Sequence, residues 1–246
     1  ELYDYVLKIA AKWVSPPYNV DGWRLDVAAD LGQSGEYNHY FWKEFRRNVK
    51  EANPNALILA EHYGDPTEWL KGDEWDTVMN YDAFMEPLTW FLTGVEKHSD
   101  EYRQDQLGNP DSFFGSMRHF MTRFHTQSLQ VAMNELSNHD HSRFLTRTNR
   151  KVGRTAYLGP EAANEGVDKA IMRLAVMIQM TWPGAPTIYY GDEAGLCGWT
   201  DPDNRRAYPW GREDQDLIDF HKEIIRVHKD YQAMKTGSIL FLHGQY

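Results

Sequence analysis

The chain has 246 residues, of which 41% are hydrophobic and 14% aromatic, which is the composition of a globular protein with a sizeable core. Its formal net charge of -10 argues against nucleic acid and anionic membranes as partners. A single cysteine excludes an internal disulfide, and the sequence shows no membrane-spanning run and no signal-peptide pattern. Because the chain does not begin with Met, we expect a piece of a longer protein and leave its localisation open.

Apolar residues recur at helical spacing in several segments, and short apolar runs lie between them. We expect helices over residues 1–14, 40–52, 112–124, 167–181 and 214–231. We expect strands over residues 23–27, 57–60, 77–81, 131–136, 187–190 and, at the end of the chain, 238–242. The alternation of strands and helices predicts an α/β fold with parallel strands and right-handed crossovers.

Three other segments lie outside these predicted helices and strands. Asp65-Pro-Thr-Glu68 has the pattern of a helix start, with a cap, a proline and a closing acid. Residues 143–166 and 196–210 lack periodicity, and we expect both to be long loops at the rim of the fold. Loops of this length are usually functional or disordered.

The stretch around Asp26 is the most informative in the chain. Alternation in the predicted strand puts Arg24 and Asp26 on one face, so Arg24 can hold Asp26 ionised. An ionised, oriented carboxylate at the carboxyl end of a strand is what a covalent nucleophile requires. The same pattern also fits a structural ion pair, and this stretch alone does not separate the two interpretations.

Two further strands end in acids. Glu61 follows the apolar run 57–60, and Asp140 follows the run that begins at residue 131. The carboxyl ends of the strands form the active face of a parallel α/β barrel. We therefore expect all three acids at the carboxyl ends of parallel strands.

Four motifs carry a family resemblance. Gly22-Trp-Arg-Leu-Asp26 resembles the nucleophile region of the α-amylase family of glycoside hydrolases (family 13). Ala60-Glu61 resembles that family's acid/base region, and Asn138-His-Asp140 resembles the region of its third acid. Gly184-Ala-Pro-Thr-Ile-Tyr-Tyr-Gly-Asp-Glu193 resembles its last barrel strand. The motifs occur in the family's order and span nearly the whole chain.

The resemblance implies a (β/α)8 TIM-barrel type of fold of which this chain holds about the second half, strands 4 to 8. Residues 1–236 would form that half, and residues 237–246 would begin a C-terminal β-domain. The first three strands, which supply an Asp and a His to the family's site, would be missing, together with a small inserted domain.

The resemblance also implies a role for each site residue. Asp26 would be the nucleophile, Glu61 the acid/base, and Asp140 the third acid, which binds sugar hydroxyls. Arg24 would aim Asp26, and His139 would bind the same hydroxyls as Asp140. Weaker candidates for substrate binding are His62, beside the acid, and Asp201 and Arg205.

The last two residues lie in Asp201-Pro-Asp-Asn-Arg-Arg206, which resembles a segment of the neopullulanase, cyclomaltodextrinase and maltogenic amylase group. The function so implied is retaining hydrolysis of α-1,4-glucosidic bonds in maltodextrins, cyclodextrins or starch-derived oligosaccharides. A solvated charge run remains the other interpretation of the segment.

Two rival classes remain beside this hypothesis. One is a non-catalytic barrel relative used for protein contacts, although such relatives tend to lose the acids. The other is a metal-dependent enzyme, although the histidines lack ligand spacing. We expect no cofactor and no metal. Half a barrel leaves open sheet edges, so we expect a homodimer or association with the missing N-terminal half, and weak or no activity of the chain alone.

Overall fold

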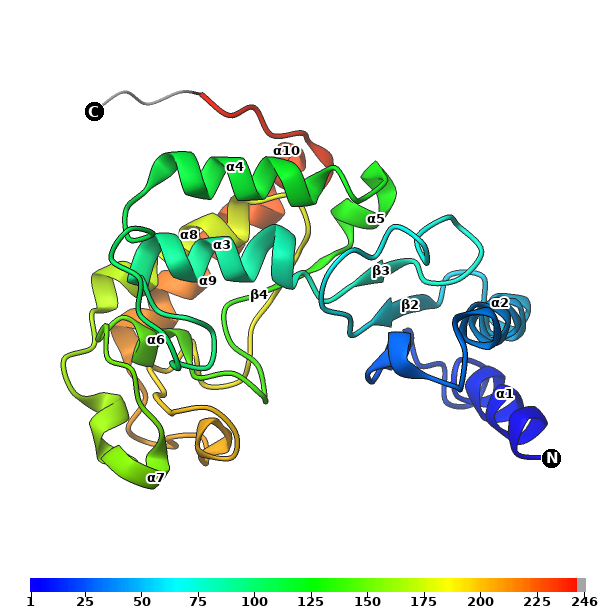
Figure 1. The fold of residues 1–246 in the computed structure, drawn as a ribbon, viewed down its shortest axis with the longest axis horizontal. Coiled ribbons are helices and arrows are strands. Elements are labelled where there is room, and N and C mark those ends of the chain that lie inside the picture. The colour runs from blue at the N-terminus through cyan, green and yellow to red at the C-terminus, as the bar shows by residue number, and fades with distance from the viewer. Residues whose placement is uncertain (243–246) are drawn as a thin grey trace. The chain divides into compact units, whose positions relative to one another are not determined.

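The computed structural model describes residues 1–242 of the chain (Figure 1). These residues form two compact units, and each is described by itself. Unit 1 consists of residues 1–79 and 122–133, and unit 2 consists of residues 80–121 and the chain from residue 134 onward. Every helix within residues 1–242 is too short or too polar to span a lipid bilayer.

Unit 1 is built on a three-stranded parallel sheet. Its strands are β1 (Gly22–Leu25), β2 (Leu57–Ala60) and β3 (Thr77–Val78), which pair in chain order. Leu25 pairs with Ala60, and Ala60 pairs with Val78, so the three strands end in register. Residues that follow these strands therefore emerge at one edge of the sheet, as parallel pairing requires.

Four helical segments belong to unit 1, namely α1 (Leu2–Trp13), η1 (Ala28–Asp30), α2 (Gly35–Ala52) and α5 (Thr126–Gln130). The α2 helix begins after Ser34, whose hydroxyl accepts a hydrogen bond from the Tyr37 N–H at 3.2 Å, a standard N-cap. Helices α1 and α2 turn apolar faces toward the strands and share one core with them. Its buried members include Leu7, Ala10, Leu25, Phe41, Trp42, Phe45, Val49 and Ile58.

Two indole rings stack in unit 1. The rings of Trp69 and Trp75 are nearly parallel, with an interplanar angle of 3° and a centroid distance of 4.8 Å. The ring of His62, which follows Glu61 in the chain, lies 4.9 Å from the Trp69 ring and 5.9 Å from the Trp75 ring. This aromatic group packs beside the carboxyl end of β2.

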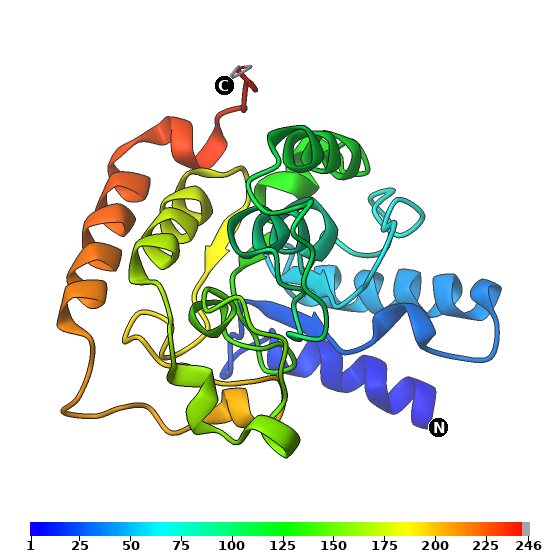
Figure 2. The ribbon, with the colours of Figure 1, turned by 60° about the vertical axis from the view of Figure 1, so that its left-hand side comes forward.

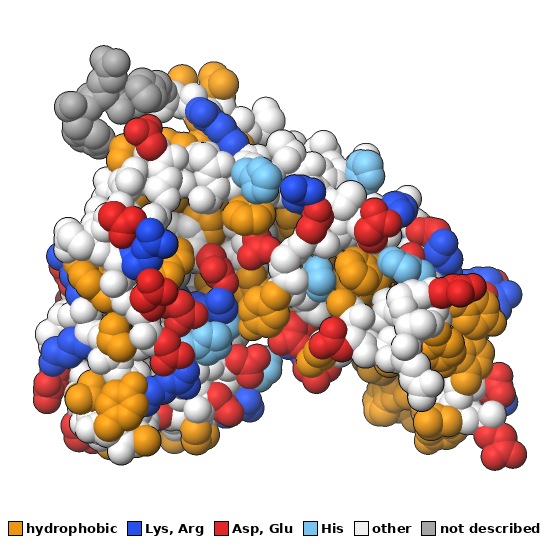
Figure 3. Space-filling model, viewed as in Figure 1, with side chains coloured by type: hydrophobic (Ala, Val, Ile, Leu, Met, Phe, Trp, Pro, Cys, Tyr) orange, Lys and Arg blue, Asp and Glu red, His pale blue; other side chains and the backbone are white. Residues whose placement is uncertain are grey.

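Helix α1 also has an exposed apolar face. Leu2, Tyr5 and Val6 are 76%, 62% and 36% exposed, and Tyr37 and Tyr40 of α2 are exposed as well. Figure 3 shows hydrophobic side chains gathered over these two helices. A contiguous apolar surface of this kind is uncommon on a soluble monomer.

Unit 2 is mainly helical. Its longer helices are α3 (Glu86–Thr93), α4 (Pro110–Met121), α8 (Lys169–Thr181) and α9 (Gln215–Asp230). Its shorter segments are the π-helix η2 (Tyr81–Met85), α6 (Phe144–Arg147), α7 (Thr155–Leu158), η3 (Glu161–Asn164), η4 (Asp203–Arg205) and α10 (Gln232–Thr236). Strand β4 (Met133–Glu135), which begins at the unit boundary, pairs with β5 (Ala185–Thr187). Helices α8 and α9 lie side by side next to β5 (Figure 2).

The approach of β4 to the residues before β5 depends on Gly184. This glycine has φ +136°, and a Cβ atom there would lie 2.3 Å from the side-chain nitrogen of Asn134. That nitrogen instead donates a hydrogen bond to the Pro183 carbonyl at 3.0 Å. Only glycine fits at this position, for both steric and conformational reasons.

The helices appear where the apolar periodicity predicted them, with shifted ends. Helix α2 begins at Gly35 and not at residue 40, because the Ser34 cap lies upstream of the apolar residues. Helix α8 begins after Asp168, whose carboxylate accepts the N–H groups of Ala170 and Ile171. The predicted helix start at Asp65 is wrong, because the Asp65 carboxylate accepts the Thr67 N–H at 3.0 Å in a turn that no helix continues.

The strand predictions need more correction. The first strand ends at Leu25 and not at residue 27, since Val27 has left-handed backbone angles that no strand can continue. The strands expected over 77–81 and 131–136 shorten to β3 and β4, and the one expected over 187–190 lies earlier, as β5. Residues 238–242 form no strand, and residues 243–246 lie outside the described residues.

The prediction of rim loops was wrong in part. Residues 143–166 contain α6, α7 and η3, and residues 196–210 contain η4. Arg143 and Arg147 have 0% exposure, so the segment around α6 lies in the interior of unit 2. Arg143 contacts Tyr190, Asp192 and Asn204, which are remote in sequence, and periodicity does not encode such contacts.

Candidate active site

Arg24 connects two of the predicted acids. It forms an ion pair through Nη1 with Asp26 Oδ1, and its Nη2 lies 3.2 Å from Glu61 Oε2. Asp26 follows β1 directly and Glu61 follows the neighbouring β2, so the parallel register brings their carboxyl groups to one edge. One guanidinium therefore contacts both carboxyl groups, and this requires them to lie close together.

The two acids differ in environment. The Glu61 side chain is only 8% exposed, whereas that of Asp26 is 77% exposed. The Glu61 backbone N–H donates to the Leu25 carbonyl at 2.8 Å, and its side-chain Oε2 accepts the Val27 N–H at 2.8 Å. Glu61 is thus fixed by backbone and side chain, while Asp26 is open to a ligand on the side away from Arg24.

His139 and Asp140 lie in a turn of unit 2. The side-chain oxygen of Asn138 accepts the N–H groups of Asp140 and His141 at 3.0 and 3.1 Å, which shapes the turn. The Asn138 amide in turn donates to Glu135 Oε1 at 2.6 Å. His139 Nε2 lies 3.6 Å from Asp140 Oδ1, and both side chains are about a third exposed, at 36% and 37%.

Asp201 and Arg205 form an ion pair with each other in unit 2. Arg205 Nε lies 2.5 Å from Asp201 Oδ1, and the two side chains are 48% and 47% exposed. The Asp201 N–H donates to the Asp140 carbonyl at 3.2 Å, and the Thr200 hydroxyl donates to the same carbonyl. The loop with Asp201 and the turn with Asp140 are therefore one hydrogen-bonded assembly.

The structure thus brings the predicted site residues together in two groups. Arg24, Asp26 and Glu61 form one group in unit 1, and His62 extends it toward the stacked indoles. His62 Nε2 lies 3.2 Å from the Asp65 carbonyl, which orients the ring. In unit 2, Asp140 and His139 form a second group with Asp201 and Arg205.

Comparison with protein families gives one match that covers nearly the whole chain. The family described as "Alpha amylase, catalytic domain" matches residues 1–236. The chain belongs to the α-amylase catalytic-domain family. The resemblance noted in the four sequence motifs is therefore confirmed.

Relatives within the α-amylase family carry similar names. A cyclomaltodextrinase from a Bacillus species is 35% identical over 247 residues, which covers 100% of this chain and 38% of that protein. Neopullulanase 2 of Thermoactinomyces vulgaris is 36% identical over 246 residues, which covers 99% of this chain and 36% of that protein. The chain thus spans little more than a third of the length of these curated relatives.

Solved α-amylase-family structures superpose well on the chain. A structure titled cyclomaltodextrinase matches with a TM-score of 0.77 at 35% identity and covers 95% of this chain and 34% of that one. The native debranching enzyme of Nostoc punctiforme matches with a TM-score of 0.77 at 30% identity, and covers 96% of this chain and 45% of that one. The parallel sheet of unit 1 is consistent with a fragment of the TIM-barrel type.

Sequence reasoning missed two residues that shape the turn with Asp140. Asn204 is fully buried, and its amide nitrogen donates to the carbonyls of Asn138 at 3.0 Å and His141 at 2.6 Å, on either side of the turn. Arg143 is also fully buried and lies 2.8 Å from Asp192 Oδ1. The signal that could have found Asn204 was its place between Asp201 and Arg205, in a motif assigned to sugar binding alone.

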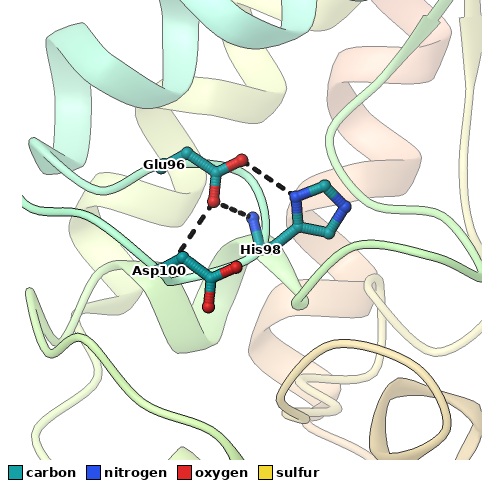
Figure 4. A group of neighbouring side chains, drawn as sticks. All are labelled: Glu96, His98 and Asp100. Atoms are coloured by element: carbon teal, nitrogen blue, oxygen red, sulfur yellow. Dashed lines mark hydrogen bonds and ion pairs between the residues drawn. The ribbon is translucent and has the colours of Figure 1, made fainter.

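A third cluster carries acids and a histidine outside these groups. Glu96, His98 and Asp100 place one ligand atom each within 4.8 Å of one another (Figure 4). Each atom already has a protein partner: Glu96 accepts from the His98 N–H at 2.7 Å and lies 2.9 Å from its ring nitrogen, while Asp100 pairs with Arg154. Burial alone would raise the pKa of Glu96, but the hydrogen bonds from His98 outweigh it and lower this pKa to about 2. All three side chains therefore have partners within the protein, and we assign no metal to the cluster.

Proposed function

We propose that this chain supplies the carboxyl pair of a retaining α-glucan hydrolase, with Asp26 as nucleophile and Glu61 as acid/base. The observation that carries the proposal is the bridge made by Arg24, which contacts both carboxyl groups at the ends of adjacent parallel strands. Retaining glycosidases need their two carboxyl groups about 5–5.5 Å apart, and a shared guanidinium favours such proximity.

The reaction follows from the two environments. Exposed Asp26 attacks the anomeric carbon and forms a glycosyl ester while Glu61 gives its proton to the departing glycosidic oxygen. Glu61 then takes a proton from water, the water oxygen attacks the same carbon, and Asp26 leaves as a carboxylate. The proton and the electron pairs balance over the two steps, and the anomeric configuration is retained.

Five other residues complete the proposal. Asp140 and His139 would bind sugar hydroxyls, and His62 would line the leaving-group side. Asp201 and Arg205 would bind a more distant sugar, and their mutual ion pair pre-orients both groups. The hydrogen bonds from Thr200 and Asp201 to the Asp140 carbonyl would couple the two positions.

For the architecture, we propose that the chain is the second half of a (β/α)8 barrel, strands 4 to 8, over residues 1–236. Residues 237–246 would begin a C-terminal β-domain. The parallel order of β1, β2 and β3 supports this assignment, as does the parallel bridge between Met79 and Met133, which continues the order toward β4. Maltodextrins, cyclodextrins or starch-derived oligosaccharides are the proposed substrates, on the strength of relatives named cyclomaltodextrinase and neopullulanase.

The anomeric configuration of the product and the activity of two variants test the proposal in the complete protein that carries this chain. NMR of the first-formed sugar should detect the α anomer, and a β product would contradict retention. Asp26→Asn should abolish turnover. Glu61→Gln should leave only the first, glycosylation step and only on substrates with good leaving groups, because such groups depart without a proton. An Asp26→Asn protein with unchanged rates would place the nucleophile elsewhere.

A further inference from the structure

Val27, which directly follows Asp26, has an unusual backbone conformation. Val27 has φ 44° and ψ 45°, in the left-handed region. A β-branched residue is a rare occupant of that region, because its side chain crowds the backbone. Such strain persists only where the surrounding structure holds it, and it concentrates at functional sites.

The ladder between β1 and β2 explains what the left-handed turn achieves. Along this ladder the Leu57 N–H donates to the Asp21 carbonyl, and the Glu61 N–H donates to the Leu25 carbonyl. Regular continuation would pair the Val27 N–H with the Glu61 carbonyl. Instead the Ala28 N–H donates to that carbonyl at 3.3 Å, and the Val27 N–H is released to donate to the Glu61 side chain at 2.8 Å.

The released N–H and Arg24 act on the same oxygen. Glu61 Oε2 accepts the Val27 N–H and lies 3.2 Å from Arg24 Nη2, whereas no described residue within 1–242 donates to Oε1. An oxygen that faces two donors is a poor place for a proton, because a protonated oxygen would turn its own hydrogen toward them. The transferable proton therefore belongs on Oε1.

We propose that Val27 is a positioning residue: its left-handed backbone holds Glu61 so that Oε2 is the permanent acceptor and Oε1 carries the proton for the leaving group. This inference rests on the proposed function of Glu61. It also ties the two acids together, because Val27 directly follows Asp26 in the chain and directly contacts Glu61. The orientation of the acid is thus set by the residue next to the nucleophile.

The test removes one N–H and leaves the side chain. In the complete protein, Val27 is replaced by the α-hydroxy acid of valine, which converts its amide to an ester. The matched control is the same replacement at Val20, whose N–H donates to the Trp13 carbonyl at 2.9 Å in the same unit. A third protein, Val27→Asn, keeps the N–H in a residue that tolerates left-handed angles.

Two substrates separate positioning from a general structural defect. Loss of a correctly placed proton slows the cleavage of a maltooligosaccharide, whose leaving group needs acid assistance. It spares the cleavage of a dinitrophenyl glycoside, whose leaving group does not. The ester at Val27 should lower the ratio of kcat/KM on the maltooligosaccharide to kcat/KM on the dinitrophenyl glycoside about ten-fold. The Val20 ester and Val27→Asn should keep this ratio within about two-fold of the unsubstituted protein. An unchanged ratio in the Val27 ester, or an equal fall in the Val20 ester, would overturn the inference.

Crystal structures of the two esters provide a readout that does not depend on turnover. The Glu61 carboxyl group should rotate away from its present position in the Val27 ester and keep it in the Val20 ester. The same orientation in both would overturn the inference. If the unsubstituted protein cleaves neither substrate, the proposed function fails, and the two crystal structures still decide whether Val27 positions Glu61.

Discussion

At the scale of single residues, Arg24 is the side chain that contacts both Asp26 and Glu61. Its planar fork of donors reaches Asp26 with one nitrogen and Glu61 with another. A lysine carries a compact charge at the end of a flexible chain and does not match such a two-sided contact. The role of Arg24 therefore depends on its geometry as much as on its charge.

Arg24→Lys should reduce kcat/KM on maltooligosaccharides by about 100-fold. The reason is that a small displacement of the acid or the nucleophile from its reactive position lowers the rate strongly. Arg46→Lys is a matched control in unit 1, since Arg46 pairs with Asp76 at 2.7 Å. That control should lose stability in urea and keep its activity. Equal kinetic losses in both variants would show that Arg24 acts only through stability.

The histidine after Asp140 gives unit 2 a pH dependence. His141 has 0% exposure, and burial, followed by the positive fields of His98, Arg147 and Lys97, lowers its pKa to about 2. The folded state keeps the ring neutral while the unfolded state binds a proton below its ordinary pKa of 6.5. Stability is therefore complete above pH 6.5 and falls as the pH drops from there toward 2.

Between pH 7 and pH 5 this one residue should cost about 2 kcal/mol of unfolding free energy. Urea titrations at the two pH values measure the loss, which should be absent in His141→Gln. His119→Gln, at an exposed site on α4, should retain it. The lowered pKa of Glu96 adds a separate loss only below its ordinary value of 4.5, so the two windows do not overlap in this range.

At the scale of elements, the sequence predicted the strands that end in acids but not the way they end. The apolar run of β2 and the Arg-x-Asp alternation of β1 are local patterns, and both strands formed. The left-handed turn at Val27, just after β1, is held by a contact with Glu61, 34 positions along the chain, which no local pattern contains. Buried Arg143 was expected in a loop for the same reason, because its partners Tyr190, Asp192 and Asn204 are remote in sequence.

The turn with Asp140 depends on one side chain of the η4 segment. The Asn204 amide joins the carbonyls of Asn138 and His141, and alanine would leave both without that donor. Asn204→Ala should therefore raise KM for maltooligosaccharides about ten-fold and lower kcat less, if Asp140 and His139 bind sugar hydroxyls.

Asn48→Ala is the matched control for that variant, since the Asn48 amide also donates to a backbone carbonyl, that of Glu44 at 2.8 Å. It should leave both kinetic constants unchanged. If Asn204→Ala keeps the original KM while it loses stability, the turn has no part in substrate binding.

At the scale of the whole molecule, the apolar face of α1 predicts association. An exposed apolar surface of this size favours burial in an interface. The commonest such interface is with a second copy of the chain related by a two-fold axis. We expect the isolated chain to form a homodimer, or to bind the other half of the proposed barrel where that is supplied, and to be weak or inactive toward maltodextrins by itself.

Sedimentation velocity tests the association, and a compact monomer of 28.7 kDa would contradict it. The double variant Leu2→Gln and Tyr5→Gln should shift the chain toward the monomer, because both side chains lie on the exposed face of α1. Leu240→Gln, at a site that is 80% exposed but outside this face, should have no effect. A maltodextrin assay on the same samples tests the weak activity, which near-normal turnover would contradict.

The stacked indoles of Trp69 and Trp75 have an optical consequence. Two parallel rings in contact absorb as a coupled pair and should give unit 1 a split signal in near-ultraviolet circular dichroism. His62, whose ring packs against both indoles, adjoins Glu61 in the chain. A sugar that displaces or shields His62 should change the emission of this pair, and Trp69→Phe should remove the split signal in circular dichroism. The protein thus contains a native fluorophore pair that packs against the residue next to its proposed acid.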